Sequence, residues 1–226
     1  MLLTSEEWAV LALSLRVGLV CVLLSLPAAV VLGWLLARRE FRGKVLLDGL
    51  CHLPLVLPPV VTGYVLLLLF SRRGILGGFF EEALGIQVAF SWKGAALASA
   101  VVGFPLALRA VRLAIEHVDP RLEQAARTLG AGPFRVFCTV TMRLAAPGLL
   151  VGALLAFARS LGEFGATITF VSNIAGETRT LPLAIYTYIN RPGGDAAVAR
   201  LAILSVVLSF AALVASEAVA RKMRRN

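Results

Sequence analysis

Two residues of opposite charge, Arg159 and Glu163, lie inside a strongly hydrophobic stretch of this sequence. Because they are four positions apart, they share one face of a helix and can form an ion pair. An isolated charge at the centre of a membrane helix costs on the order of 2.5 to 3.5 kcal/mol, so both side chains are expected to face protein or water. Two interpretations stay open: an ion pair that stabilises the helix, and a pair of charged groups along a path through the membrane.

The sequence lacks the residue patterns that would make this chain an enzyme. It has no phosphate-binding run of the form GxxxxGK[ST], no HExxH and no recognisable Ser-His-Asp set. Its three cysteines, Cys21, Cys51 and Cys138, are scattered without the spacing of a disulfide framework or a metal site. We therefore expect a chain that is not an enzyme and binds no cofactor or metal of its own.

Composition places the chain in a membrane. Of its 226 residues, 59% are hydrophobic and 15% are charged, which is too apolar for a soluble domain of this length. The net charge of +9 does not indicate a nucleic-acid partner, since the basic residues flank hydrophobic runs instead of gathering on one soluble face. No internal repeat is visible, so we expect one membrane domain over residues 10–218 that contacts lipid.

The hydrophobic runs predict an all-α protein with about five membrane-crossing helices. A helix of about 20 apolar residues crosses the roughly 30 Å hydrocarbon layer. The expected crossings are residues 10–37, 49–71, 91–110, 147–171 and 200–220. A shorter apolar run, LPLAIYTYI at residues 181–189, is expected to form a re-entrant or interfacial helix outside.

The second predicted crossing carries several helix-disturbing residues. Pro58 and Pro59, followed by Gly63, remove backbone donors and loosen the helix. Interrupted membrane helices occur where the freed carbonyls face protein or a water-filled path. This segment is therefore expected either to line a translocation pathway or to hold a static kink.

The basic residues predict the orientation. Of the 22 Lys and Arg residues, six fall on one side of the predicted crossings and two, Arg16 and Arg159, within them. The other 14 share the opposite side: Arg38, Arg39, Arg42, Lys44, Arg109, Arg112, Arg121, Arg127, Arg135, Arg143, Arg221, Lys222, Arg224 and Arg225. Cytoplasmic loops carry the excess of positive charge. The N-terminus is therefore expected outside and the C-terminus in the cytoplasm.

Residues 119–137, on the cytoplasmic side, predict two short helices separated by a turn. Asp119 can cap the first helix and Pro120 suits its first position. Gly130 can adopt the left-handed conformation that ends it, and Pro133 can begin the second. An apolar stripe at i, i+3, i+4 and i+7 runs along the first helix: Leu122, Ala125, Ala126 and Leu129. The stripe is expected to meet a partner protein or, alternatively, lipid headgroups.

The same segment resembles the coupling-loop signature of ABC importer permeases, in which an acidic residue and two alanines precede a glycine at a fixed distance. Here Gln124 takes the acidic position, with Glu123 beside it, and Gly130 follows at the expected spacing. Met142 and Arg143 replace the Leu-Pro that ends the family pattern. The resemblance implies contact with a cytoplasmic ATPase through Leu122, Glu123, Gln124, Ala125, Ala126, Leu129 and Gly130.

Four further runs, at residues 52–64, 122–132, 157–173 and 176–182, closely resemble molybdate importer permeases. The resemblance implies a type I ABC importer permease fold and a homodimer in the bacterial inner membrane. It also implies an external oxyanion-binding protein and two ATPase subunits that carry ATP and Mg²⁺. Sulfate and thiosulfate permeases are similar, so they remain an alternative.

An ion-coupled secondary transporter is the alternative from a different class. Arg159, Glu163 and Glu217 are the intramembrane charges that would relay protons in such a protein. Secondary transporters usually show paired repeats, however, and this sequence has five unlike crossings and a cytoplasmic docking helix. These features favour the ABC permease.

Overall fold

The computed structural model describes the backbone of residues 3–224, with the side chains of 219, 220 and 222–224 left out. Arg225 and the side chains of Lys222 and Arg224, part of the predicted cytoplasmic charge cluster, lie outside this description. Every regular element in the described range is helical, as predicted. The helices are α1 (Ser5–Arg38), α2 (Lys44–Val56), α3 (Pro59–Phe70), α4 (Ile75–Leu84), α5 (Trp92–Glu116), α6 (Pro120–Thr128), α7 (Pro133–Val136), a π-helical turn (Phe137–Thr141), α8 (Met142–Leu161), α9 (Gly165–Val171), α10 (Leu181–Ile189) and α11 (Asp195–Arg224).

Within the described residues, four helices are long and apolar enough to cross a membrane: α1, α5, the continuous run Pro133–Leu161, and Asp195–Ala218 of α11. A fifth crossing is obtained only if α2 and α3 are taken together. The number agrees with the five crossings predicted. The short α10 also forms where the sequence predicts a helix too short to cross.

The crossing predicted over residues 49–71 is interrupted at its prolines, where the sequence predicts a bend or kink. The segment is broken into α2 and α3, which are bent by 112° relative to each other. Pro58 and Pro59 have no backbone N–H, and a proline disfavours the helical conformation of the residue before it. Leu57 accordingly takes an extended conformation, with φ −67° and ψ 143°.

The fourth crossing also differs from its predicted bounds of 147–171. The helical run begins at Pro133 on the cytoplasmic side, passes through the π-helical turn and ends at Leu161. Residues 162–164 then interrupt it before α9 begins. The carboxylate of Glu163 accepts a hydrogen bond from the backbone N–H of Ala166 at 2.8 Å, which favours a new helix start over continuation of α8.

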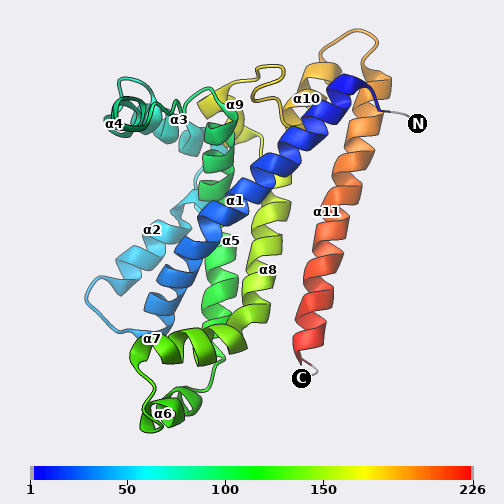
Figure 1. The fold of residues 1–226 in the computed structure, drawn as a ribbon. Helices are drawn as coiled ribbons and strands as arrows, with labels where there is room; N and C mark the ends of the chain where they lie inside the picture. Colours follow the sequence, from blue (N-terminus) through cyan, green and yellow to red (C-terminus); the bar gives the residue numbers. More distant parts are fainter. Residues whose placement is uncertain (1–2, 225–226) are drawn as a thin grey trace.

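The bundle is centred on α1, α5 and α8, with α1 running obliquely across the other two (Figure 1). Small residues allow this close packing: Gly148 of α8 faces the methyl group of Ala114 of α5, and Gly18 of α1 faces Phe157 of α8. In a membrane, helix association relies on such van der Waals contact because lipid is as apolar as the side chains.

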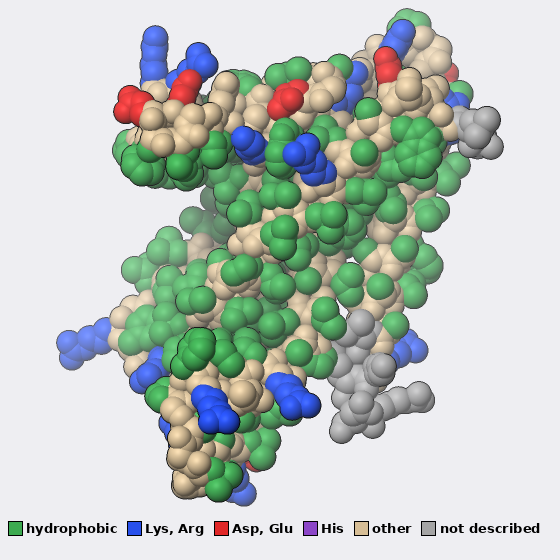
Figure 2. Space-filling view, in the orientation of Figure 1, with side chains coloured by type: hydrophobic (Ala, Val, Ile, Leu, Met, Phe, Trp, Pro, Cys, Tyr) green, Lys and Arg blue, Asp and Glu red, His purple; other side chains and the backbone are tan. Residues whose placement is uncertain are grey.

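The two ends of the molecule are distinct. The N-terminus, α4 and α10 lie at one end, and α6, α7 and the C-terminus lie at the other (Figure 1). Charged side chains gather at both ends, and hydrophobic side chains cover the region between them (Figure 2). This arrangement agrees with the predicted topology, in which the termini lie on opposite sides and α6 shares the side of the C-terminus.

The two interruptions of the crossing helices pack against each other. A methyl group built on Gly63 of α3 would lie 2.5 Å from the carbonyl oxygen of Ala166 in α9. One built on Gly165, the first residue of α9, would lie 2.7 Å from the Pro59 side chain of α3. Because a glycine makes each of these contacts, the backbones of α3 and α9 can touch.

We expect Gly63→Ala to destabilise the protein, since its methyl group meets backbone on α9. Overpacking of this kind costs about 1 to 3 kcal/mol. Gly162→Ala is the matched control, since a methyl group there would meet nothing within 4 Å. Thermal unfolding in detergent checks both variants. Equal unfolding midpoints for Gly63→Ala, Gly162→Ala and the parent would contradict the close α3–α9 contact.

Candidate functional site

The cytoplasmic helix α6 has the ends that the sequence predicts. The Asp119 carboxylate accepts a hydrogen bond from the backbone N–H of Arg121 at 2.9 Å, and Pro120 is the first helical residue. At the other end Gly130 has φ +86°, in the left-handed region. The N–H of Ala131 donates to the carbonyl of Ala126 at 3.0 Å, and that of Gly130 donates to Arg127 at 3.0 Å. This hydrogen-bond pattern is a Schellman motif, so both ends of α6 are fixed.

The apolar stripe of α6 is exposed within the described chain. Leu122 is 49% exposed and Leu129 89% exposed. Gln124 and Ala125 are also exposed, and Ala126 is half-buried. The helix lies at the cytoplasmic tip of the molecule, away from the bundle (Figure 1). A contiguous apolar surface on a polar end of a membrane protein is typical of a protein-binding site.

Glu123 does not belong to this exposed surface. Its side chain is 11% exposed, and Oε1 accepts hydrogen bonds from Nη2 of Arg38 at 3.1 Å and from Oγ1 of Thr141 at 2.8 Å. The resemblance implies an ATPase contact for Glu123, but the structure turns this carboxylate toward the bundle. The position follows from the helix period, since consecutive residues are about 100° apart around the helix axis and Glu123 can face the bundle while Leu122 stays exposed.

The predicted ion pair between Arg159 and Glu163 is present. Nη1 of Arg159 lies 2.8 Å from Oε2 of Glu163, and the side chains are 29% and 2% exposed. The two residues are not on one continuous helix, because α8 ends at Leu161. Glu163 therefore joins the last turn of α8 to the first turn of α9, holding Arg159 with one carboxylate oxygen and the N–H of Ala166 with the other.

Of the other predicted pathway residues, Pro58 and Pro59 lie at the α2–α3 break, whereas Gly63 is buried within α3. Pro58 precedes α3, Pro59 is its first residue, and both are exposed. Because neither has an N–H, the carbonyls of Pro54 and Leu55 lack the donors that a continuous helix would supply. Lipid offers no substitute donor, so this surface must meet protein or water.

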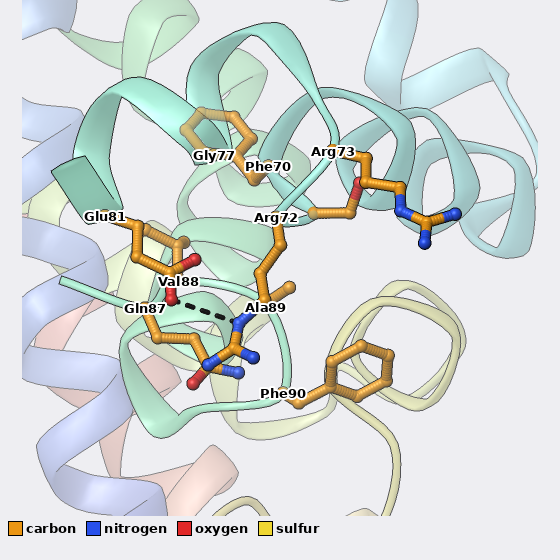
Figure 3. Close-up of a pocket in the computed structure, with 10 residues that line it drawn as sticks. Phe70, Arg72, Arg73, Gly77, Glu81, Gln87, Val88, Ala89 and Phe90 are labelled. Atoms are coloured by element: carbon orange, nitrogen blue, oxygen red, sulfur yellow. Dashed lines mark ion pairs between the residues drawn. The ribbon is translucent and has the colours of Figure 1, made fainter.

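The outer end holds a cavity that no sequence pattern predicts. A cavity of about 480 Å³ lies between the end of α3, helix α4 and the segment 87–90 that precedes α5. The side chain of Arg72 points into it beside Gln87, and its Nε lies 3.1 Å from Oε1 of Glu81 (Figure 3). Arg72 is 70% exposed in its side chain, so this ion pair contributes little to stability.

A second feature of the outer end joins residues far apart in the sequence. Oε1 of the buried Glu7 in α1 accepts hydrogen bonds from Arg200 of α11, from Nη2 at 2.6 Å and from Nε at 3.0 Å. The hydroxyl of Tyr188 in α10 donates to Glu6 at 3.1 Å, and burial together with this hydrogen bond raises the Tyr188 pKa. These contacts fasten α10 and α11 to the start of α1.

No cluster of three or more His, Cys, Asp or Glu side chains that could hold a metal ion occurs in the described part of the chain. The described charged groups of the crossing region include the Arg159–Glu163 ion pair, and the exposed apolar side chains of the cytoplasmic end include Leu122 and Leu129 of α6.

Comparison with known proteins identifies the class. Residues 29–225 match the family model described as "Binding-protein-dependent transport system inner membrane component". The chain belongs to this family. It is thus a permease component of an inner membrane transport system and not its ATPase.

The relatives match along most or all of the chain. The molybdenum transport system permease protein ModB of Escherichia coli K12 is 58% identical over 226 residues, covering 100% of this chain and 99% of the relative. ModB of Haemophilus influenzae is 53% identical over 220 residues, covering 97% of this chain and 96% of the relative. The sulfate transport system permease protein CysT of Escherichia coli K12 is 39% identical over 182 residues, covering 80% of this chain and 64% of CysT.

Solved structures confirm the predicted fold class. A bacterial ABC transporter that imports alginate gives a TM-score of 0.71 at 16% identity, covering 99% of this chain and 80% of that chain. The MetNI methionine ABC transporter gives a TM-score of 0.63 at 19% identity, and the match covers 94% of this chain and 93% of that chain. The all-helical arrangement is therefore that of an ABC importer permease.

We expect Arg159→Ala and Glu163→Ala each to destabilise the protein, since each leaves its partner as an unpaired charge in a low-dielectric region. The double variant should regain part of the loss, with a coupling energy of about 1 kcal/mol or more. Unfolding midpoints of the parent and the three variants check this. Strictly additive losses would show that the two side chains do not stabilise each other.

Proposed function

We propose that this chain is the permease subunit of an ATP-driven importer for molybdate, with tungstate as a second substrate. The observation that carries the proposal is the 58% identity to a molybdenum transport permease over the full length of both chains. The sulfate permease CysT is less similar and matches over 64% of its own length. Family membership likewise favours an ATP-driven importer over an ion-coupled secondary transporter.

In this proposal two copies of the chain form the membrane unit, two ATPase subunits bind beneath it, and an oxyanion-binding protein docks outside. The apolar stripe of α6 is exposed at Leu122, Ala125 and Leu129 and half-buried at Ala126, which supports a groove on each ATPase as its partner. ATP and Mg²⁺ belong to those ATPases. The family description, which names dependence on a binding protein, supports the external partner.

Transport proceeds by alternating access. Closure of the two ATPases on ATP draws the two α6 helices together, and the helices around the dimer axis open the path to the outside. Hydrolysis and product release return the path to the inward-open state. A rigid α6 suits this task because its capped N-terminus and its Schellman motif prevent fraying at either end.

In this mechanism the anion passes beside the two helix breaks. Arg159 is half-buried there and presents a cationic guanidinium, while Glu163 neutralises part of its charge. An unpaired arginine in a low-dielectric site would hold a dianion strongly. A paired one attracts it weakly enough for release, which a transport pathway requires. Molybdate, tungstate and sulfate are all tetrahedral dianions, so selection lies mainly in the binding protein.

Reconstituted complex tests the proposal directly. Proteoliposomes containing the permease, its ATPase and its binding protein should accumulate radiolabelled molybdate only with ATP. Unlabelled tungstate should compete at similar concentrations and sulfate only in large excess. Sulfate uptake that molybdate does not inhibit would favour the sulfate permease, and uptake driven by an ion gradient without ATP would favour a secondary transporter.

We expect Ala126→Glu or Leu129→Glu to abolish assembly with the ATPase while leaving the chain inserted in the membrane. Burying an unpaired carboxylate at an interface costs several kcal/mol, at least a hundredfold in affinity. Thr128→Glu is the matched control, since Thr128 is an exposed residue of α6 outside the stripe. Co-purification of the ATPase measures the effect. Normal binding by both stripe variants would refute the docking surface.

A further inference from the structure

Helix α6 is attached to the bundle by one buried side chain. Of its residues, only Glu123 is buried in the described structure, at 8% exposed. Its Oε1 accepts hydrogen bonds from Nη2 of Arg38 and Oγ1 of Thr141, at 3.1 and 2.8 Å. The same Nη2 of Arg38 donates to the carbonyl of Val118 at 2.7 Å. A single carboxylate therefore connects α6 with the end of α1, the joint after α5, and the start of α8.

The contact on the α8 side falls on an unusual backbone element. Thr141 is 1% exposed and is the last residue of the π-helical turn Phe137–Thr141. There the N–H of Met142 donates to the carbonyl of Phe137, one residue further back than in an α-helix. Such turns are rare and often occur at functional sites. The ring of Phe137 also meets Trp34 of α1 edge-on, with centroids 5.9 Å apart.

A cavity borders these hydrogen bonds. A cavity of about 500 Å³ lies between the end of α1 and the α6–α7 segment, and Trp34, Arg39 and Arg127 are among its walls. Arg38 also lines the cavity, and its Nε is buried without a hydrogen-bond partner in the described structure. The hydrogen bonds of Glu123 to Arg38 and Thr141 are the buried polar link between α6 and these helices in the described structure.

We propose that Glu123, held by Arg38 and Thr141, is the positioning residue that transmits movement of α6 to α1, α5 and α8. The inference rests on the proposed function, in which the ATPases move α6. Hydrogen bonds to a charged group are stronger than those between neutral groups, so displacement of α6 is transmitted through Glu123 in either direction. Glu123 touches neither ATP nor the anion, and its effect is on coupling alone.

Distance measurements test this without any transported anion. In a variant whose three cysteines are replaced, spin labels are placed on Arg121→Cys, at α6, or on Arg73→Cys, at the outer end. In the assembled dimer with its ATPases, ATP plus vanadate should change both inter-protomer distances. With Glu123→Gln the α6 distance should still change, and the outer distance should not. An outer change equal to that of the parent would overturn the inference.

Activity supplies the second measurement. We expect Glu123→Gln and Thr141→Val complexes to assemble and hydrolyse ATP at no less than half the parent rate, with uptake per ATP reduced at least tenfold. Glu123→Asp should restore part of the coupling, and Thr128→Ala, an exposed position of α6, should match the parent. Parallel loss of assembly, hydrolysis and uptake would overturn the inference in favour of a purely structural role. Failure of the parent to take up molybdate would refute the proposed function and leave the distance test intact.

Discussion

The structure depends on one constraint: within the hydrocarbon layer, lipid supplies no hydrogen-bond partner to the peptide backbone. The chain satisfies this requirement with long helices, except at Leu57–Pro58 and at residues 162–164. The two interruptions lie together, because Gly63 and Gly165 allow α3 and α9 to touch. Non-helical backbone at membrane depth is tolerated where protein or a water-filled path covers it. A path through the bundle is therefore expected beside these breaks, because protein or water must cover their non-helical backbone.

Two buried carboxylates lie where separate helices meet. The Arg159–Glu163 pair lies at the second break, where the carboxylate also binds the first turn of α9. At the cytoplasmic end a second buried carboxylate, Glu123, connects α6 to the helices that carry the breaks and pack around them. In the proposed mechanism one carboxylate organises the path and the other transmits movement toward it. Both carboxylates are buried and join separate helices. An exposed ion pair would stabilise such a junction only weakly.

Local features of the fold could be predicted from the sequence, and those that depend on distant contacts could not. The ends of α6 follow from Asp119, Pro120 and Gly130, whose conformational preferences act within one turn. Hydrophobic length predicts the number of crossings, yet it misses the break at 162–164, because a helix interruption capped by the buried Glu163 has no hydropathy signal. The stripe of α6 identifies its exposed face but not the partners of Glu123, which come from positions 38 and 141. The bond between Glu7 and Arg200 spans 193 residues and leaves no local pattern.

The most direct test of the account is whether water reaches the helix breaks in the assembled transporter. A single cysteine replaces Val60, an exposed residue beside Pro59, or Phe210 on the exposed face of α11, in a variant whose native cysteines are replaced. The account predicts that a hydrophilic, membrane-impermeant thiol reagent modifies Val60→Cys, in a way that changes with ATP, and leaves Phe210→Cys unmodified. Equal lack of reaction at both positions, with and without ATP, would contradict a path beside the breaks.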